Sequence, residues 1–381
     1  MKIYKLIYKW RGCLLLFYCS VIMFSCQSFE QNLTIPTIEA DITSNAKLRL
    51  SEYFDNFRMI KLPSDTIMGE IERIKYENNC IYISDGRTLF IFSESGELLS
   101  CFEKRGNGPG EYSGITDFMI DGENIVVLDR SQQRLITYEH SGKAVATRNL
   151  GYNVQAISPI VDNSFFLHCS IDCSHKLLRM RNGQIDSSYL AIDKNQAEYL
   201  FVFAHHNFYQ DQKSVYFFQP INDTVYVSTE GGSINPFFYV DFKGKNIPSS
   251  FLKNKYRDVK NFFDQLHEKP YAYGVYNFAM CDPFLMFCSF YQKNKKLTVF
   301  DRKNNSSNTF ATVKDDVYFN DLTIPVSEFI YHANKHIVVP LDAFSVVEWK
   351  QTHPPVEQFK EMVNATKEGD NPLLLIFDFK Q

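Results

Sequence analysis

The chain has 381 residues, with 40 basic and 44 acidic side chains that give a formal net charge of −4 at pH 7. A mildly acidic chain without a lysine- or arginine-rich run lacks the electrostatic footprint of nucleic-acid-binding proteins, and nothing in it predicts binding to anionic lipid. The 34 phenylalanines and 22 tyrosines, which fall in short segments rich in β-branched residues, predict a fold made mainly of strands.

The N-terminus has the pattern of a secretory signal. Lys2 to Arg11 carry only positive charges, and an apolar run from Cys13 to Phe24 follows them. This run is too short to cross a bilayer as a helix, which needs about 20 residues. Because Ser25 and Cys26 end the run, the segment resembles a bacterial lipoprotein signal, in which the cysteine is acylated with fatty acids such as palmitate.

We therefore expect residues 1–25 to be a signal peptide that is removed, and Cys26 to carry the lipid and become the mature N-terminus. Met23 is bulkier than is usual in such signals, so an ordinary signal peptide or an uncleaved membrane anchor is the alternative. Residues 26–50 are polar and without a strong pattern, which predicts a flexible tether between lipid and folded domain.

Residues 51–381 contain a repeat with a spacing of about 45 residues, and each unit has four short strand-like segments separated by turn residues. The two clearest units begin near Ile71 and Ile115, and each has a Ser-Gly turn before its last strand. Weaker units follow across the rest of the chain. A four-stranded repeat of this length is typical of a propeller blade, so the sequence predicts an all-β, six-bladed β-propeller of antiparallel blades. Five or seven blades are the alternatives.

Two further features concern how the propeller is completed. Residues 249–267 and 355–367 carry apolar residues at helical spacing, which predicts two short helical insertions packed against the blades. The apolar segment Leu373–Phe379 and the isolated segment Asp55–Leu62 are expected to complete the same terminal blade, because an open ring would leave sheet edges unpaired.

The segment Arg105-Gly-Asn-Gly-Pro-Gly-Glu-Tyr112 is similar to a glycine-rich segment of a family of bacterial six-bladed β-propeller lipoproteins. The segment Asn371–Leu375 near the C-terminus is similar too. That family is similar in pattern to propellers with NHL-type repeats. The resemblance implies a propeller anchored in the outer membrane, on its periplasmic or cell-surface side, and it implies no particular activity.

Arg105, Glu111 and Tyr112 are the first candidate ligand-binding residues. The alternating glycines between them do not match a dinucleotide- or phosphate-binding loop, and a strand instead of a helix follows. We favour a structural interpretation, in which these glycines supply positive φ angles to a tight crossover between blades. In the alternative, Glu111 and Tyr112 contact a ligand on the face of the disc.

His205 and His206 are the second candidates, because strand alternation would point one of them toward the central channel. Related propeller enzymes hold catalytic metals in that channel. A further cluster contains soft metal ligands but lacks a second pair at zinc-finger spacing. We expect no cofactor, with a bound divalent metal as the alternative. That cluster is His168, Cys169, Cys173 and His175.

The sequence thus favours a ligand-binding or protein-interaction scaffold on the cell envelope, with a glycan, a peptide or a protein as partner. The alternative is a metal-assisted hydrolase or lyase with its site in the central channel, although neither Gly-x-Ser-x-Gly nor His-Glu-x-x-His occurs. The six cysteines after Cys26 are expected to be buried thiols, and Cys169 and Cys173 are the pair most suited to form a disulfide.

Overall fold

The computed structural model describes residues 35–160, 164–169, 173–193, 207–211, 214–219, 221–229, 231–326, 331–333 and 336–380. The chain divides into two units, Met1–Ile35 and Pro36–Gln381, and the described residues lie almost entirely in the second. The signal peptide and Cys26 are outside the described residues, as are His205 and His206. Within the described part of the chain, no helix has both the length and the apolar character needed to cross a membrane.

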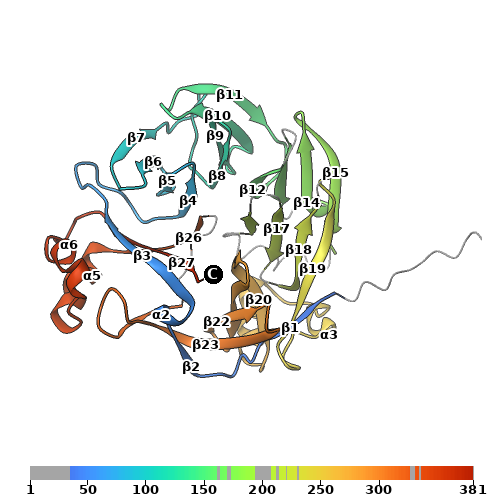
Figure 1. The fold of residues 1–381 in the computed structure, drawn as a ribbon. Helices are drawn as coiled ribbons and strands as arrows, with labels where there is room; N and C mark the ends of the chain where they lie inside the picture. The colour runs from blue at the N-terminus through green and yellow to red at the C-terminus, as the bar shows by residue number, and fades with distance from the viewer. Residues whose placement is uncertain are drawn as a thin grey trace, which may run out of the picture. The chain divides into compact units, whose positions relative to one another are not determined.

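Strands dominate the second unit and form six sheets across the described residues. Figure 1 shows these sheets arranged as blades around a common centre. Consecutive strands within a blade pair antiparallel, as expected for short strands joined by tight turns. The fold is therefore a six-bladed β-propeller, and the prediction from the four-stranded repeat is confirmed.

Each of the first three blades contains four strands that follow one another along the chain. The first turn shows why the sequence folds back: Asn78 and Asn79 have φ angles of 50° and 57°, in the left-handed region that asparagine tolerates better than most residues. The strands of these blades are β4 (Arg73–Glu77), β5 (Cys80–Ser84), β6 (Thr88–Ser93), β7 (Leu98–Glu103), β8 (Asp117–Asp121), β9 (Asn124–Asp129), β10 (Arg134–Glu139), β11 (Ala144–Asn149), β12 (Val154–Ile160), β13 (Ser164–Cys169), β14 (His175–Arg181) and β15 (Gln184–Ala191).

The fourth and fifth blades are built on the same plan, but each gains a strand from the N-terminal segment on its outer edge. In both cases the added strand runs parallel to the outermost strand of the blade. The strands are β16 (Phe208–Gln210), β17 (Val215–Gln219), β18 (Asn222–Ser228), β19 (Ile234–Asp241), β20 (Ala272–Cys281), β21 (Phe284–Tyr291), β22 (Asn294–Asp301), β23 (Ser306–Asp315) and β24 (Leu322–Ile324), with β1 (Thr37–Glu39) added to β19 and β2 (Ala46–Arg49) added to β23.

These two added strands correct the prediction of a tether over residues 26–50, because residues 36–50 belong to the folded unit. Ile38, Ile42 and Leu48 are almost fully buried, and Thr37 pairs with Tyr239 across the β1–β19 edge. Most other side chains of β1 and β2 are exposed, so the sequence shows little apolar pattern. Backbone hydrogen bonds along an open sheet edge are what position the segment.

The sixth blade joins the two ends of the folded unit. Its strands are β25 (Tyr331–Ala333), β26 (His336–Leu341), β27 (Leu373–Phe379) and β3 (Phe54–Lys61), in that spatial order. β27 pairs antiparallel with β26 on one side and with β3 on the other. All seven residues of β27 are buried. The prediction that Asp55–Leu62 and Leu373–Phe379 complete the same blade is confirmed.

Short helices occupy the two insertions. The predicted helix over residues 249–267 is in fact two helices, and Asp258 begins the second by accepting a hydrogen bond from the backbone N–H of Asn261. Its buried Phe262 and Leu266 pack in one cluster with Tyr273 of β20, so this stripe docks on blade five as expected. In the second insertion the longest helix precedes the predicted range. The helices are α2 (Leu50–Tyr53), α3 (Ser249–Leu252), α4 (Val259–His267), α5 (Ala343–Thr352), η2 (Glu357–Phe359) and α6 (Lys360–Asn364).

The apolar core lies between neighbouring blades. One cluster, for example, joins Tyr82 and Ile91 of the first blade to Phe118 and Ile120 of the second. The cysteines follow this core only in part: Cys169, Cys173 and Cys288 are buried, Cys80 and Cys281 are half-buried, and Cys101 is exposed. The expectation of uniformly buried thiols was therefore wrong for Cys101.

Candidate functional site

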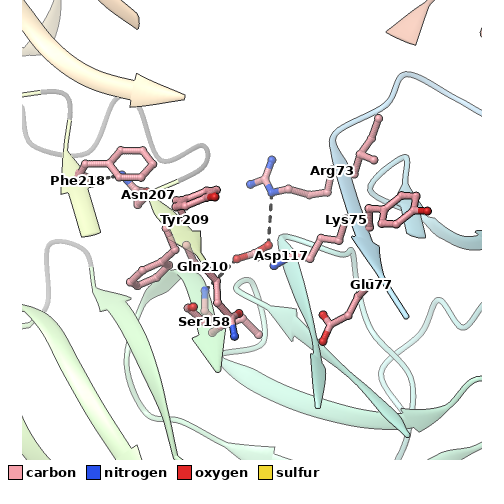
Figure 2. A pocket seen from close by; sticks show the side chains of 14 residues that line it. Arg73, Lys75, Glu77, Asp117, Ser158, Asn207, Tyr209, Gln210 and Phe218 are labelled. Carbon is pink, nitrogen blue, oxygen red and sulfur yellow. Dashed lines mark hydrogen bonds and ion pairs between the residues drawn. The ribbon is translucent and has the colours of Figure 1, made fainter. Parts of the chain in front are cut away.

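A hollow of about 100 Å³ lies where the innermost strands of neighbouring blades face one another. Figure 2 shows its side chains converging from several blades. Its walls come from β4, β8, β12 and β16, together with one residue of β17 and the residue before β16. The polar lining residues are Arg73, Lys75, Glu77, Asp117, Ser158, Asn207, Tyr209 and Gln210.

The sequence of β4 explains how charged side chains reach this position. Successive side chains of a strand point to opposite sides, so Arg73, Lys75 and Glu77 share one side of β4. Ile74 and Tyr76 share the other side and are buried in an apolar cluster with residues of blade six. The strand thus packs one side into the core and presents three charges to the hollow.

Arg73 and Asp117 form an ion pair, with 3.6 Å between the Arg73 Nε and Asp117 Oδ1 atoms. Both side chains are almost completely buried, and Figure 2 shows them pointing toward one another. The carboxylate also accepts hydrogen bonds from the backbone N–H groups of Phe118 and Ile157, each at 2.9 Å. Because these groups belong to blades one, two and three, the pair holds three innermost strands together. A buried charge needs this degree of compensation.

Lys75 and Glu77 are in a different situation. Among the described residues, the structure shows no hydrogen bond or ion pair for either side chain. The Lys75 ammonium lies 5.6 Å from the centre of the Phe118 ring, a cation–π contact that leaves its N–H groups available. Burial raises the pKa of Glu77, and the nearby Lys75 charge lowers it to a smaller extent. The hollow therefore offers one cationic and one acidic group to a ligand.

A second polar system lies beside the hollow and is centred on His168. The His168 Nδ1 atom is 2.9 Å from Asn207 Oδ1, and Asn207 Nδ2 donates to the Phe218 carbonyl. Asn207 must therefore accept at Oδ1, so Nδ1 of His168 carries the proton. His168 Nε2 is left to accept from Gln219 Nε2 at 3.1 Å. Burial lowers the pKa of His168 to about 3, so the imidazole stays neutral.

The candidate metal ligands do not converge in the described part of the chain, where no group of three or more His, Cys, Asp or Glu side chains could hold a metal ion. Both ring nitrogens of His168 are occupied by hydrogen bonds. Cys169 and Cys173 lie against one another, and this contact together with burial raises the pKa of the Cys169 thiol. Both side chains are thiols in the structure, so the expected disulfide between them is not formed there.

The segment between Arg105 and Tyr112 is braced from within. The Tyr112 side chain is fully buried, and its hydroxyl donates to the Arg87 carbonyl at 2.6 Å and accepts from the Lys104 N–H at 3.1 Å. The Glu111 carboxylate accepts from the Gly108 N–H at 2.8 Å. Gly110 has a φ of 72°, in the region that favours glycine.

These contacts agree with the structural interpretation of the glycine-rich segment. Tyr112 is not accessible to a ligand, and Glu111 is half-buried and holds its own loop. Arg105 is exposed. None of these three residues lines the central hollow. His205 and His206 fall outside the described residues, but Asn207, which follows them, does line the hollow.

Sequence analysis missed the charged residues of the hollow, although a signal was present. The run Arg73-Ile-Lys-Tyr-Glu77 alternates charged and apolar residues at the start of the first blade. The first strand of a blade lies nearest the centre, so charges there face the channel and not solvent. Asp117, at the start of the first strand of the next blade, gives the same signal.

Comparison with known proteins gives a family and structural neighbours. A model of the family described as "Domain of unknown function (DUF4934)" matches residues 33–378. A protein of Bacteroides fragilis NCTC 9343 that is described as exported has a similar structure, with a TM-score of 0.71 at 20% identity, over 91% of this chain and 100% of that chain.

A member of the DUF4221 family from Bacteroides vulgatus ATCC 8482 is also similar, with a TM-score of 0.50 at 12% identity, over 86% of this chain and 98% of that chain. No curated protein matches the sequence. At these identities the likeness concerns the fold alone.

Proposed function

The chain belongs to the DUF4934 family, and we propose that this member is a ligand-binding β-propeller of the cell envelope whose ligand occupies the central hollow. The observation that carries the proposal is the pair of charged residues, Lys75 and Glu77, that line a hollow at the centre of the fold. Concave sites with a few convergent polar groups are where proteins bind small molecules.

The energetics of burial support a ligand role over a purely structural one. Removing a charge from water is costly unless a partner compensates it. Arg73 and Asp117 compensate one another and join three blades, which accounts for their presence. Lys75 and Glu77 are half-buried and have no such partner among the described residues, so their hydrogen-bonding groups remain available to a ligand.

The size of the hollow narrows the range of ligands. Its volume is about 100 Å³. Typical pockets for drug-sized molecules are about 300–1,000 Å³. The hollow therefore accepts a molecule of a few heavy atoms, whereas a glycan or peptide could insert only one end.

The envelope location rests on the N-terminal signal. We propose that Cys26 is acylated and holds the propeller at the outer membrane. The similar Bacteroides fragilis protein is described as exported, which supports a location outside the cytoplasm.

A ligand screen with a blocked hollow tests the proposal. Gln210 lines the hollow but is itself exposed, so Gln210→Trp should reduce the free volume without disturbing the core. Small acids, bases, neutral polar molecules and zwitterions would be tested for binding to the full-length protein by saturation-transfer NMR. We expect at least one compound to bind the wild type and to lose binding in Gln210→Trp.

The matched control is Val145→Trp, which adds the same bulk to an exposed position on the outer strand β11. This variant should bind like the wild type. A panel in which no compound responds to Gln210→Trp would show that the hollow is not a binding site.

A further inference from the structure

We propose that the ligand of the hollow is a free α-amino acid with a small side chain, whose carboxylate binds the Lys75 ammonium and whose ammonium binds the Glu77 carboxylate. This inference rests on the proposed ligand site and adds the chemical class of the ligand. It follows from the placement of two opposite charges, from the limited volume and from the pairing of the other charges.

The first step is the spacing of the two charges. Lys75 and Glu77 are two residues apart on β4, so their Cα atoms are separated by about 6.6 Å and their side chains share one side of the strand. Both residues line the hollow, and Figure 2 shows the Lys75 side chain extending toward Asp117 while the Glu77 side chain leaves β4 in a different direction. In an α-amino acid a single carbon separates the ammonium from the carboxylate, so one small molecule carries both of the charges that Lys75 and Glu77 can pair with.

The second step is that the two head groups affect one another without pairing. The charge of Lys75 lowers the pKa of Glu77, so the groups are close enough to interact through space. They are nevertheless not joined by an ion pair among the described residues. A molecule that carries both charges can pair with both side chains.

The third step is the exclusion of other small ligands. A simple anion would pair with Lys75 but would be repelled by Glu77, and a simple cation would be repelled by Lys75. The Arg73–Asp117 pair adds no net charge to this balance, because its members compensate each other. A hollow of about 100 Å³ also favours a few heavy atoms over a sugar ring.

The experiment uses four probes against the full-length protein: glycine, alanine, N-acetylalanine and alanine amide. N-acetylalanine lacks the ammonium and alanine amide lacks the carboxylate, while both keep the rest of alanine. A charge-assisted hydrogen bond is worth about 1.5–3 kcal/mol, and 1.4 kcal/mol corresponds to a tenfold change in affinity. We therefore expect each blocked probe to bind the wild type at least about tenfold more weakly than alanine.

Two variants assign each charge to its partner. Glu77→Gln should weaken alanine binding and remove most of the preference for alanine over N-acetylalanine. Lys75→Met should weaken alanine binding and remove most of the preference for alanine over alanine amide. A control with Lys143→Met, an exposed lysine in the second blade, should leave both preferences unchanged.

The outcomes separate this inference from the proposed function. In one outcome, acids, bases or neutral compounds bind the hollow and lose binding in Gln210→Trp, but the blocked probes bind the wild type as well as alanine does. The proposal of an amino-acid ligand is then wrong, whereas the proposed ligand site stands. If no compound responds to Gln210→Trp, both are wrong. The comparison of the four probes on the wild type does not depend on any variant folding.

Discussion

The polar side chains near the centre of the propeller are held in defined protonation states by their neighbours. His168 is buried, and its two ring nitrogens bind Asn207 and Gln219. Its pKa is lowered to about 3 from an ordinary value of 6.5, because burial disfavours the imidazolium. Between pH 6.5 and about pH 3, His168 is therefore neutral in the folded protein but protonated in the unfolded chain.

This difference predicts how stability depends on pH. The contribution of His168 is present above pH 6.5 and is lost as the pH falls, because only the unfolded state then gains the proton. Between pH 6.5 and pH 5 the loss amounts to about 2 kcal/mol of unfolding free energy. In His168→Gln this loss should disappear, which urea denaturation of both proteins at several pH values would measure.

Two other buried groups change the stability in the opposite direction as the pH falls, so the wild type must be compared with His168→Gln. Burial raises the pKa of Asp223 and of Asp315 to about 6, and their contributions favour the folded state as the pH falls. The difference between wild type and His168→Gln removes these contributions. A control at the half-buried His353, His353→Gln, should keep the pH dependence of the wild type. Parallel curves for the wild type and His168→Gln would contradict the prediction.

At the scale of single residues, the sequence predicted little of the candidate site. Alternation in Arg73-Ile-Lys-Tyr-Glu77 was available, but charges at alternate positions usually face solvent, and only the position of β4 in the ring turns them inward. Ligand contact by Tyr112 was kept as the alternative to a structural role, because the sequence does not show that its hydroxyl bonds to the distant Arg87 carbonyl. Spacing along the chain does not reveal such contacts.

At the scale of single elements, apolar pattern decided what could be predicted. The strands of the first two blades were recognisable because buried and exposed residues alternate along them and their turns contain glycine or asparagine. The helix α5 was missed because its sequence, Ala343-Phe-Ser-Val-Val-Glu-Trp, has no clear apolar stripe and resembles a strand. β1 and β2 were missed because few of their side chains are buried.

A deletion series tests the unequal contributions of the terminal strands. Removing residues 371–381 takes away β27, which lies between β26 and β3 and is buried throughout, so we expect no cooperative unfolding transition. Removing residues 27–45 takes away β1 with Ile38 and Ile42, which contribute about 1.5–3 kcal/mol each through burial, so this protein should fold but melt at lower temperature.

Removing residues 27–35, which precede β1, is the control and should leave the melting temperature nearly unchanged. Calorimetry of the four proteins gives the order directly. A protein without residues 371–381 that still unfolds cooperatively near the wild-type temperature would contradict the role of β27 in closing the ring.

At the scale of the whole molecule, the period of the repeat was the most informative feature of the sequence. Six four-stranded units predicted six blades, and the isolated N-terminal strand predicted closure through the sixth. The prediction succeeded because each blade is a continuous stretch of sequence with its own turn residues and its own alternation of apolar and polar residues. The proposed attachment to the envelope depends instead on a single residue, Cys26.

The proposed attachment through Cys26 predicts a change in partitioning. Cys26→Ala should still be exported, but it should lack the acyl chains and move from the detergent-rich to the aqueous phase of a Triton X-114 extract, because no apolar anchor remains. Cys101→Ala, which removes an exposed thiol from the propeller, is the control and should partition like the wild type. A Cys26→Ala protein that stays with the detergent would exclude lipidation at this position.

The parallel and antiparallel edges formed by the N-terminal strands also determine when the protein can fold during its synthesis. Ribosomes make Thr37 and Lys61 early, whereas their partners Tyr239 and Leu373 emerge much later. The last blade cannot be completed before Leu373–Phe379 has been made, and contacts between such distant parts of a chain also form slowly. The proposed export through a translocon requires an unfolded chain, and a ring that stays open until the final residues are made meets this requirement. Any product that terminates before Leu373 lacks the strand that closes the ring.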